Sequence, residues 1–335
     1  MSMPRVRVGR VAVVGATSLR GKELKALLGE SVVAAEIRLL DEEAAGTLTE
    51  AAGEAALVLP AVAENFEGAE FVFFAGRPEF AARHWADARR AGARVIDLSG
   101  ALAEVESAVP WIPALDRTLP PPVERRGGLY WSPSTPAIVA TTLAAALAPF
   151  RPTQMAAVFF VPVSEYGQAG VNELESQTVQ LLSFHTIPKD VFAAQVAFNL
   201  LGSFGAESTV RLADLRGRIS HEVARYLAGR ATLPAVQVIQ APVFFGYAFT
   251  ACLTLEAACS TTELEQALAR AGVVVRGETE EAPSSVNVAG ESRILVRAPE
   301  ADATVPNTYW LWGAADNLRL AAANAVGIAE RLRAC

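Results

Sequence analysis

The chain has 335 residues, of which 52% are hydrophobic and 19% are charged, and its formal net charge is −7. A chain of this length and composition can bury a large core, and at about 100–200 residues per domain it should form about two domains. The negative charge leaves no basic face for nucleic acid or for an anionic membrane surface, so we expect neither as a partner. The expected partner is a small molecule or another protein.

The cysteines and the N-terminal segment bear on the cellular compartment. Cys252, Cys259 and Cys335 are odd in number and lack a CxxC spacing, which indicates neither a disulfide framework nor a zinc site, and we expect no metal. This pattern favours a reducing cytoplasm. The first apolar stretch is short and runs straight into a glycine turn, unlike a signal peptide. No stretch approaches the 18 apolar residues of a membrane span.

The first third of the chain alternates predicted strands and helices. The run VRVGRVAVVGA at 6–16 is rich in β-branched residues and ends at a glycine, as a buried parallel strand does before its turn. Further strands are predicted at 36–40, 70–75 and 94–98, and helices at 19–28 and 80–91. This rhythm predicts a Rossmann-like parallel sheet with helices on both faces.

A Pro- and Gly-rich stretch at 119–136 separates this part from the rest. We predict a dinucleotide-binding domain of residues 1–133 with 316–335, and a dimerisation or substrate domain of residues 134–315. The second domain should be α+β with a largely antiparallel sheet. Beyond the stretch, helices are predicted at 137–147, 220–227, 262–271 and 316–332, and strands at 155–163, 236–241, 243–255 and 293–298.

A glycine turn lies between the first predicted strand and the first predicted helix. It runs from Gly15 through Thr17 and Ser18 to Gly21. Backbone N–H groups and the positive end of a helix can hold a pyrophosphate at such a turn. The spacing is not the standard GxGxxG, so the alternative is a tight turn between strand and helix that binds no ligand.

The second predicted strand ends in an acidic segment, Asp41-Glu42-Glu43. An aspartate at this place can accept hydrogen bonds from both ribose hydroxyls of NAD, whereas carboxylates would repel the 2′-phosphate of NADP. If a dinucleotide binds, the sequence therefore favours NAD over NADP. The alternative is a solvated acidic turn with no role in binding.

Several segments in succession resemble the aspartate-semialdehyde dehydrogenase family. VAVVGATS resembles its VAVVGATG start, FVFFAG and ARVIDLSGA resemble two later strands, and SEYGQAG at 164–170 resembles its SGAGQAG loop. FAAQVAFN at 192–199, APVFFG at 241–246 and LWGAADNLRLAAANA at 311–325 follow in the family's order. The resemblance covers almost the whole chain and implies the family's two-domain fold and a homodimer.

The family's reaction is the NADPH-dependent reductive dephosphorylation of aspartyl phosphate through a cysteine thioester. The resemblance places Thr135 at the position of the nucleophilic cysteine and Tyr247 at that of the histidine base. A threonine hydroxyl needs an adjacent base to act as a nucleophile, and a tyrosine with a pKa near ~10 is a poor proton acceptor at pH 7. Gln168 matches the family's orienting glutamine.

The resemblance also shows which binding residues have changed. Gln240 stands where a substrate-binding arginine is expected, and Gly76 lies in the turn near the nicotinamide, where SAGGS has become AGRP. Asn317 of the closing helix matches the family and is assigned to the cofactor site. The phosphate-binding EExK region aligns ambiguously around Leu215–Arg218.

Two functional hypotheses follow. The first is a catalytically inactive relative that acts through binding, with NAD, NADP or no cofactor, and with a second copy of itself or another protein as partner. The alternative is an active NAD(P)-dependent oxidoreductase that uses altered catalytic residues on a different substrate or on the family's substrate. Loss of the nucleophile alone costs on the order of 10⁶ in kcat in a well-studied covalent catalyst, which favours the first hypothesis.

Overall fold

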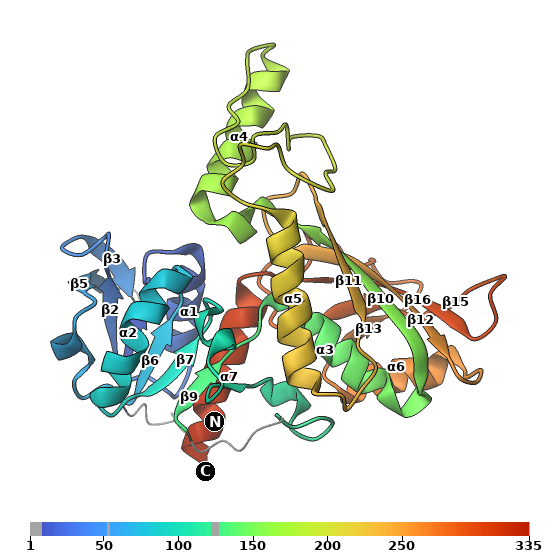
Figure 1. Ribbon diagram of the computed structural model, residues 1–335, viewed down its shortest axis with the longest axis horizontal. Helices are drawn as coiled ribbons and strands as arrows, with labels where there is room; N and C mark the ends of the chain where they lie inside the picture. The colour runs from blue at the N-terminus through green and yellow to red at the C-terminus, as the bar shows by residue number, and fades with distance from the viewer. Residues whose placement is uncertain (1–8, 52–53, 122–126, 335) are drawn as a thin grey trace. The chain divides into compact units, whose positions relative to one another are not determined.

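The computed structural model describes residues 9–51, 54–121 and 127–334 (Figure 1). The chain divides into two compact units: Met1–Ser134 with Ala321–Cys335, and Thr135–Leu320. Cys335 lies outside the described residues, and Cys252 and Cys259 are free thiols. Within the described ranges, no helix is both long and apolar enough to cross a lipid bilayer.

The first unit contains a seven-stranded sheet whose described pairings are all parallel. The strand order is β5-β2-β1-β6-β7-β9-β8. The strands are β1 Arg10–Val14, β2 Glu36–Asp41, β5 Leu59–Pro60, β6 Phe71–Phe74, β7 Arg94–Asp97, β8 Val109–Pro110 and β9 Leu129–Trp131. A separate hairpin pairs β3 Leu48–Ala51 with β4 Glu54–Leu57. The parallel sheet predicted from the alternating elements is confirmed, and positions 6–8 of the first predicted strand lie outside the described residues.

Helices cover both faces of this sheet because its central strands are apolar on both sides. Val11 and Val13 of β1 pack in one core cluster with α1 (Leu19–Glu30) and the last part of α7 (Arg319–Ala334). Ala12 and Val14 point to the other face, where α2 (Pro78–Arg90) packs. A strand places alternate side chains on opposite faces, so β1 lies at the centre of a three-layer arrangement.

The second unit is built on a mixed, mostly antiparallel sheet of order β11-β10-β12-β16-β14-β13, with β15 paired to β16. The pairs β10–β11 and β13–β14 are parallel, and the others are antiparallel. The strands are β10 Pro152–Val161, β11 Ala235–Gln240, β12 Tyr247–Leu255, β13 Val274–Arg276, β14 Leu295–Arg297, β15 Glu300–Ala301 and β16 Thr308–Ala315. The predicted α+β class with a largely antiparallel sheet is therefore confirmed.

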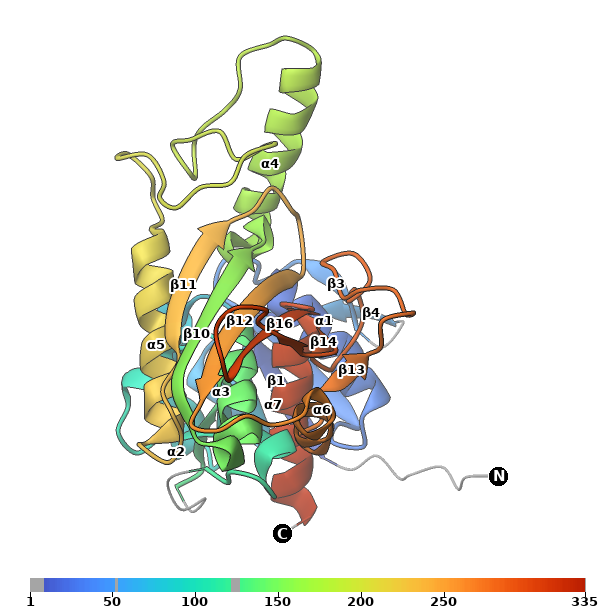
Figure 2. The same cartoon turned by 90° about the vertical axis from the view of Figure 1, so that its right-hand side faces the viewer.

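Four α-helices belong to this unit: α3 Thr135–Leu147, α4 Gly167–Leu182, α5 Leu212–Leu227 and α6 Thr261–Arg270. Every residue of α3 is buried, because this helix packs against both β10 and α5. Figures 1 and 2 show α5 running beside β11, and α4 rising from the end of β10. One face of the sheet is thus covered by helices, while Trp310 and Trp312 remain exposed on β16.

The structure departs from the sequence predictions at several elements. The strand predicted at 243–255 begins only at Tyr247, because Gly246 adopts a φ of 79°, which is incompatible with a continuous strand. The helix predicted at 220–227 begins earlier, at Leu212. Neither α4 nor β16 was predicted. β16 lies at the centre of the sheet, where an uninterrupted apolar pattern gives little periodic signal.

Candidate active site and nucleotide-binding turn

The glycine turn of the first unit is fixed by backbone contacts that leave no room for side chains. Gly15 has a φ of 76°, and a Cβ on it would collide with the backbone of Gly76. A Cβ on Gly21 would collide with the carbonyl oxygen of Gly15. The turn after β1 and the turn after β6 therefore contact each other through glycine backbone. Because these glycines carry no side chains, a bound pyrophosphate could come close to the backbone here.

Ser18 and Arg20 hold this turn in place. The Ser18 hydroxyl accepts a hydrogen bond from the N–H of Gly21 at 2.9 Å and donates to the carbonyl of Ala75 at 2.9 Å. It is thus the N-cap of α1 and also a link to the end of β6. The Arg20 guanidinium donates to the carbonyl of Leu98 at 2.6 Å. Both side chains therefore bond to the protein framework at the edge of the turn.

The structure brings Thr17 and Asp41 together. The Thr17 hydroxyl donates to one carboxylate oxygen of Asp41 at 2.8 Å, and the other oxygen accepts the N–H of Glu43 at 3.1 Å. Asp41 is only 4% exposed. A carboxylate has about four acceptor positions, so capacity remains for ribose hydroxyls, but part of it is already used within the fold.

The rest of the acidic segment forms ion pairs with α2. Glu43 pairs with Arg77, and Glu42 pairs with Arg83 and with His84, whose Nε2 lies 2.7 Å from the carboxylate. Arg77 also lies over the ring of Phe80, at 5.0 Å from its centroid. The two glutamates, which look like part of a solvated acidic turn in the sequence, are therefore paired with arginines 34 and 41 residues away.

In the second unit, Asn317 bonds to Thr135 at the predicted nucleophile position, to Gly246 beside Tyr247, and to Ser164. Its carbonyl oxygen accepts the hydroxyl of Thr135 at 2.8 Å. Its side chain accepts the N–H of Gly246 at 2.9 Å and donates to the hydroxyl of Ser164 at 3.0 Å. The hydroxyl at the predicted nucleophile position therefore donates its hydrogen bond to a backbone carbonyl. A carbonyl cannot remove the hydroxyl proton, so the contact does not activate Thr135 as a nucleophile.

Tyr247 is completely buried at the start of β12. Its ring meets Phe159 edge-on, with the centroids 6.2 Å apart. Burial raises the pKa of Tyr247 well above its usual value, and the nearby Glu165 carboxylate raises it further. The phenol is therefore neutral at physiological pH and is not available as a proton acceptor.

The two glutamines at predicted site positions have different surroundings. Gln240 is fully buried, and its amide donates to the carbonyls of Val161 at 2.9 Å and Ala241 at 2.8 Å. Gln168 is exposed in the first turn of α4 and bonds to Asn172 at 2.8 Å, within its own helix. Gln240 thus contributes to the core of the strand pair β10–β11 and offers no cation to a substrate carboxylate.

Sequence reasoning missed an ion pair in this unit. Glu165, in the short helix Val163–Tyr166, accepts a hydrogen bond from the Arg218 guanidinium of α5 at 2.6 Å. Burial disfavours the charged guanidinium, but the carboxylates of Glu165 and Glu222 outweigh this effect and raise the pKa of Arg218. Glu165 and Arg218 are 53 residues apart in the sequence. The family's EExK region matches the segment of Arg218 only ambiguously, so the sequence does not predict this ion pair.

Sequence reasoning also missed the structural role of Asp97. This carboxylate is completely buried and accepts hydrogen bonds from the N–H and hydroxyl of Ser99 and from the N–H of Leu102. Burial raises the pKa of Asp97, although these bonds partly oppose that shift. Its contacts fix the loop after β7.

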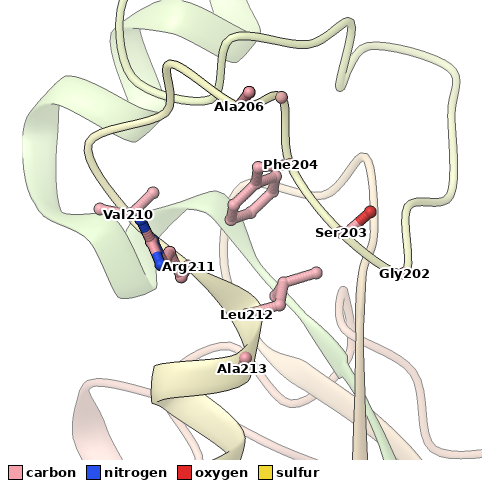
Figure 3. Close-up of a pocket in the computed structure, with 9 residues that line it drawn as sticks. Gly202, Ser203, Phe204, Ala206, Val210, Arg211, Leu212 and Ala213 are labelled. Atoms are coloured by element: carbon pink, nitrogen blue, oxygen red, sulfur yellow. The ribbon is translucent and has the colours of Figure 1, made fainter.

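A cavity of about 390 Å³ lies at the N-terminal end of α5 (Figure 3). Figure 3 shows Phe204 and Leu212 among the residues that line it, with Arg211 beside them. The cavity belongs to the loop before α5, and its lining includes none of Thr135, Gln240 or Tyr247.

Comparison with known proteins gives two family matches. Residues 10–119 match the semialdehyde dehydrogenase NAD binding domain, and residues 143–320 match the semialdehyde dehydrogenase dimerisation domain. A USG-1 protein homolog of Pseudomonas aeruginosa is 33% identical over 333 residues, covering 96% of this chain and 97% of that protein. A USG-1 protein homolog of Azotobacter vinelandii is 30% identical over 330 residues, with the same coverage.

A solved structure from Pseudomonas aeruginosa, described as a probable aspartate-semialdehyde dehydrogenase, agrees in fold. Its TM-score is 0.83 at 32% sequence identity, and the match covers 96% of this chain and 97% of that one. The matched domains, the relatives of 30–33% identity and this structure agree with one another. The chain therefore belongs to the semialdehyde dehydrogenase family.

Proposed function

We propose that this protein is a non-catalytic member of its family that acts by binding, either to a nicotinamide dinucleotide or to a protein partner. The proposal rests on the surroundings of the side chains at the predicted nucleophile and base positions, Thr135 and Tyr247. The Thr135 hydroxyl bonds to a carbonyl, and Tyr247 is a buried, neutral phenol. Covalent catalysis needs an activated nucleophile and a base that can take a proton near pH 7, and neither side chain supplies them.

Binding of a nicotinamide dinucleotide fits the first unit. A Cβ on Gly15 would collide with the backbone of Gly76, and a Cβ on Gly21 would collide with the carbonyl oxygen of Gly15, so glycine is required at both positions. These positions would hold the pyrophosphate against backbone N–H groups at the start of α1. Such a cofactor supplies hydride transfer when the rest of a site is competent. The match to an NAD binding domain supports the same assignment.

An activity assay with the purified protein tests the proposal. We expect no reduction of NADP or NAD above background with aspartate semialdehyde and phosphate as substrates. Turnover within about a hundredfold of an authentic family enzyme would overturn the proposal, because loss of the nucleophile alone should cost far more. Cooperative thermal unfolding of the same sample serves as the control that the protein is folded.

We also propose that the protein is a homodimer that pairs through the uncovered face of the second unit's sheet. Trp310 and Trp312 of β16 are 43% and 38% exposed there, and Trp312 lies against Phe160 of β10, with ring centroids 6.1 Å apart. A soluble monomer rarely leaves such an aromatic surface open to water. The match to a dimerisation domain supports this assignment.

Sedimentation equilibrium at micromolar concentration tests the dimer. Thr250 pairs directly with Trp312 across the strands, so Thr250→Lys places a charge on the proposed interface and should weaken the dimer at least about tenfold. The control is Ala82→Lys, which adds the same charge on the exposed side of α2 in the first unit. A wild-type monomer, or equal effects of the two lysines, would refute the proposed interface.

A further inference from the structure

The ion pair between Glu165 and Arg218 lies where the end of β10 meets α5. The segment of Glu165 is fixed in place, because the N–H of Ser164 donates to the carbonyl of Phe244 at 3.1 Å and the N–H of Glu165 donates to that of Pro162 at 3.1 Å. Arg218 lies between the buried residues Leu215 and Glu222 on the covered face of α5. The carboxylate is therefore held against the guanidinium by the framework.

Part of the Arg218 side chain is open to solvent despite this contact, although its guanidinium Nε is buried. Its side chain is 30% exposed, whereas that of Glu165 is 13% exposed. Without the carboxylate, the position beside the Arg218 Nη2 that Glu165 fills would be open to a small ion. A guanidinium binds carboxylate and phosphate with matching geometry, so Arg218 is chemically suited to hold either anion.

The charges around Arg218 disfavour a further anion. Glu222 is 1% exposed and acts on the same guanidinium, so two carboxylates surround one cation. The phenols of Tyr166 and Tyr247 also lie close enough to interact electrostatically with this guanidinium. In the SGAGQAG loop that this segment resembles, the position of Glu165 is a glycine, which carries no side chain. The Glu165 carboxylate therefore has no counterpart in the family loop that this segment resembles.

We propose that Glu165 is a built-in ligand of Arg218, which occupies the guanidinium in place of a small carboxylate or phosphate and so excludes anionic ligands from this position. The inference rests on the proposed loss of catalysis, to which it adds a specific feature that keeps anionic substrates out. It assigns Glu165 as a specificity-determining residue. Removal of its charge should convert Arg218 into an anion site.

Titration of purified variants with sodium phosphate and, separately, with sodium succinate tests this inference. Binding is measured by calorimetry and by the shift of melting temperature, against sodium chloride at the same ionic strength. Glu165→Gln keeps the volume of the side chain, and Glu165→Ala opens the position completely. The matched control is Glu256→Gln, which removes the same charge from the exposed ion pair with Arg151 in the same unit.

We expect Glu165→Gln or Glu165→Ala to bind at least one of the two anions at least about tenfold more tightly than wild type, because a like charge no longer competes. The control should resemble wild type, and the double variant Glu165→Gln/Arg218→Gln should lose the gain. Folded variants that bind neither anion would overturn the inference, whatever the activity assay shows. If the variants do not fold, wild-type protein that binds either anion as tightly as an ordinary arginine site would overturn it as well.

Discussion

The side-chain oxygen of Asn317 accepts a hydrogen bond from the backbone N–H of Gly246 at 2.9 Å. Gly246 ends the irregular segment before β12, and Asn317 precedes α7, so this bond joins two parts of the second unit that are 71 residues apart. The same amide donates to Ser164. The resemblance places Asn317 in the cofactor site, whereas its side chain here connects the segments of Gly246 and Ser164.

Asn317→Ala should therefore lower the free energy of unfolding by about 2–3 kcal/mol, because it leaves a buried N–H and a buried hydroxyl without their partner. Urea denaturation measures this loss. The matched control is Asn172→Ala, which removes an exposed amide bonded to Gln168 and should cost less than about 0.5 kcal/mol. Equal costs for the two variants would show that Asn317 is not the connection described above.

Introducing a thiol at position 135 should not confer catalysis. Thr135→Cys alone, and Thr135→Cys with Tyr247→His, should both remain at least about a thousandfold below an authentic family enzyme. The residues of a catalytic unit act together, so a nucleophile and a base are insufficient when the substrate is not bound in place. Gln240 supplies no cation, and Arg218 is already paired with Glu165. Initial rates with aspartate semialdehyde, phosphate and NADP decide the matter, and recovery of the family's rate would refute this argument.

The local pattern of apolar and turn residues predicts the strands of the fold better than it predicts the contacts of the candidate site. Strands such as β6 and β7 were predicted nearly to the residue, because short apolar runs bounded by turn residues mark buried strands. The ion pairs Glu165–Arg218 and Glu43–Arg77 were not predicted, since each joins residues more than 30 positions apart. Sequence spacing carries no information about contacts of that kind until the topology is known. The burial of Tyr247 was likewise hidden, because its strand begins after an irregular segment.

The buried phenol of Tyr247 should make the protein lose stability at alkaline pH. Its pKa is raised in the folded state, whereas tyrosine in the unfolded chain ionises near ~10. The stabilisation is fully present below pH ~10 and is lost as pH rises towards the folded pKa, by about 1.4 kcal/mol per pH unit for each such group. Tyr247→Phe should therefore flatten the decline of unfolding free energy between pH 10 and pH 11.

Urea denaturation from pH 8 to pH 11 measures this slope. Burial also raises the pKa of Tyr166, so the double variant Tyr166→Phe/Tyr247→Phe should flatten the decline further. An unchanged slope in Tyr247→Phe would mean that this phenol ionises in the folded protein as readily as in the unfolded chain.

The last prediction concerns the choice between NAD and NADP, which the acidic segment after β2 should decide. Family members that bind NADP have a serine and an arginine in a LASxRSxG segment, and the resemblance places Asp41 and Glu43 at these positions. A lost charge-assisted hydrogen bond forfeits about 1.5–3 kcal/mol, and each carboxylate close to a phosphate adds about 1 kcal/mol or more of repulsion. We therefore expect NAD to bind more tightly than NADP, or neither to bind.

The ion pair between Glu43 and Arg77 makes this prediction testable by one substitution. Glu43→Arg removes a carboxylate, adds a guanidinium and releases Arg77 from its partner, so two cations become available to a 2′-phosphate. Calorimetry should then show the ratio of NADP affinity to NAD affinity rise at least about tenfold, or NADP binding appear where there was none. The control Glu67→Arg makes the same change of charge at an exposed position of the first unit and should leave the ratio unchanged. Wild-type protein that binds NADP in the low micromolar range and more tightly than NAD would show that Asp41 and Glu43 do not face the 2′ position.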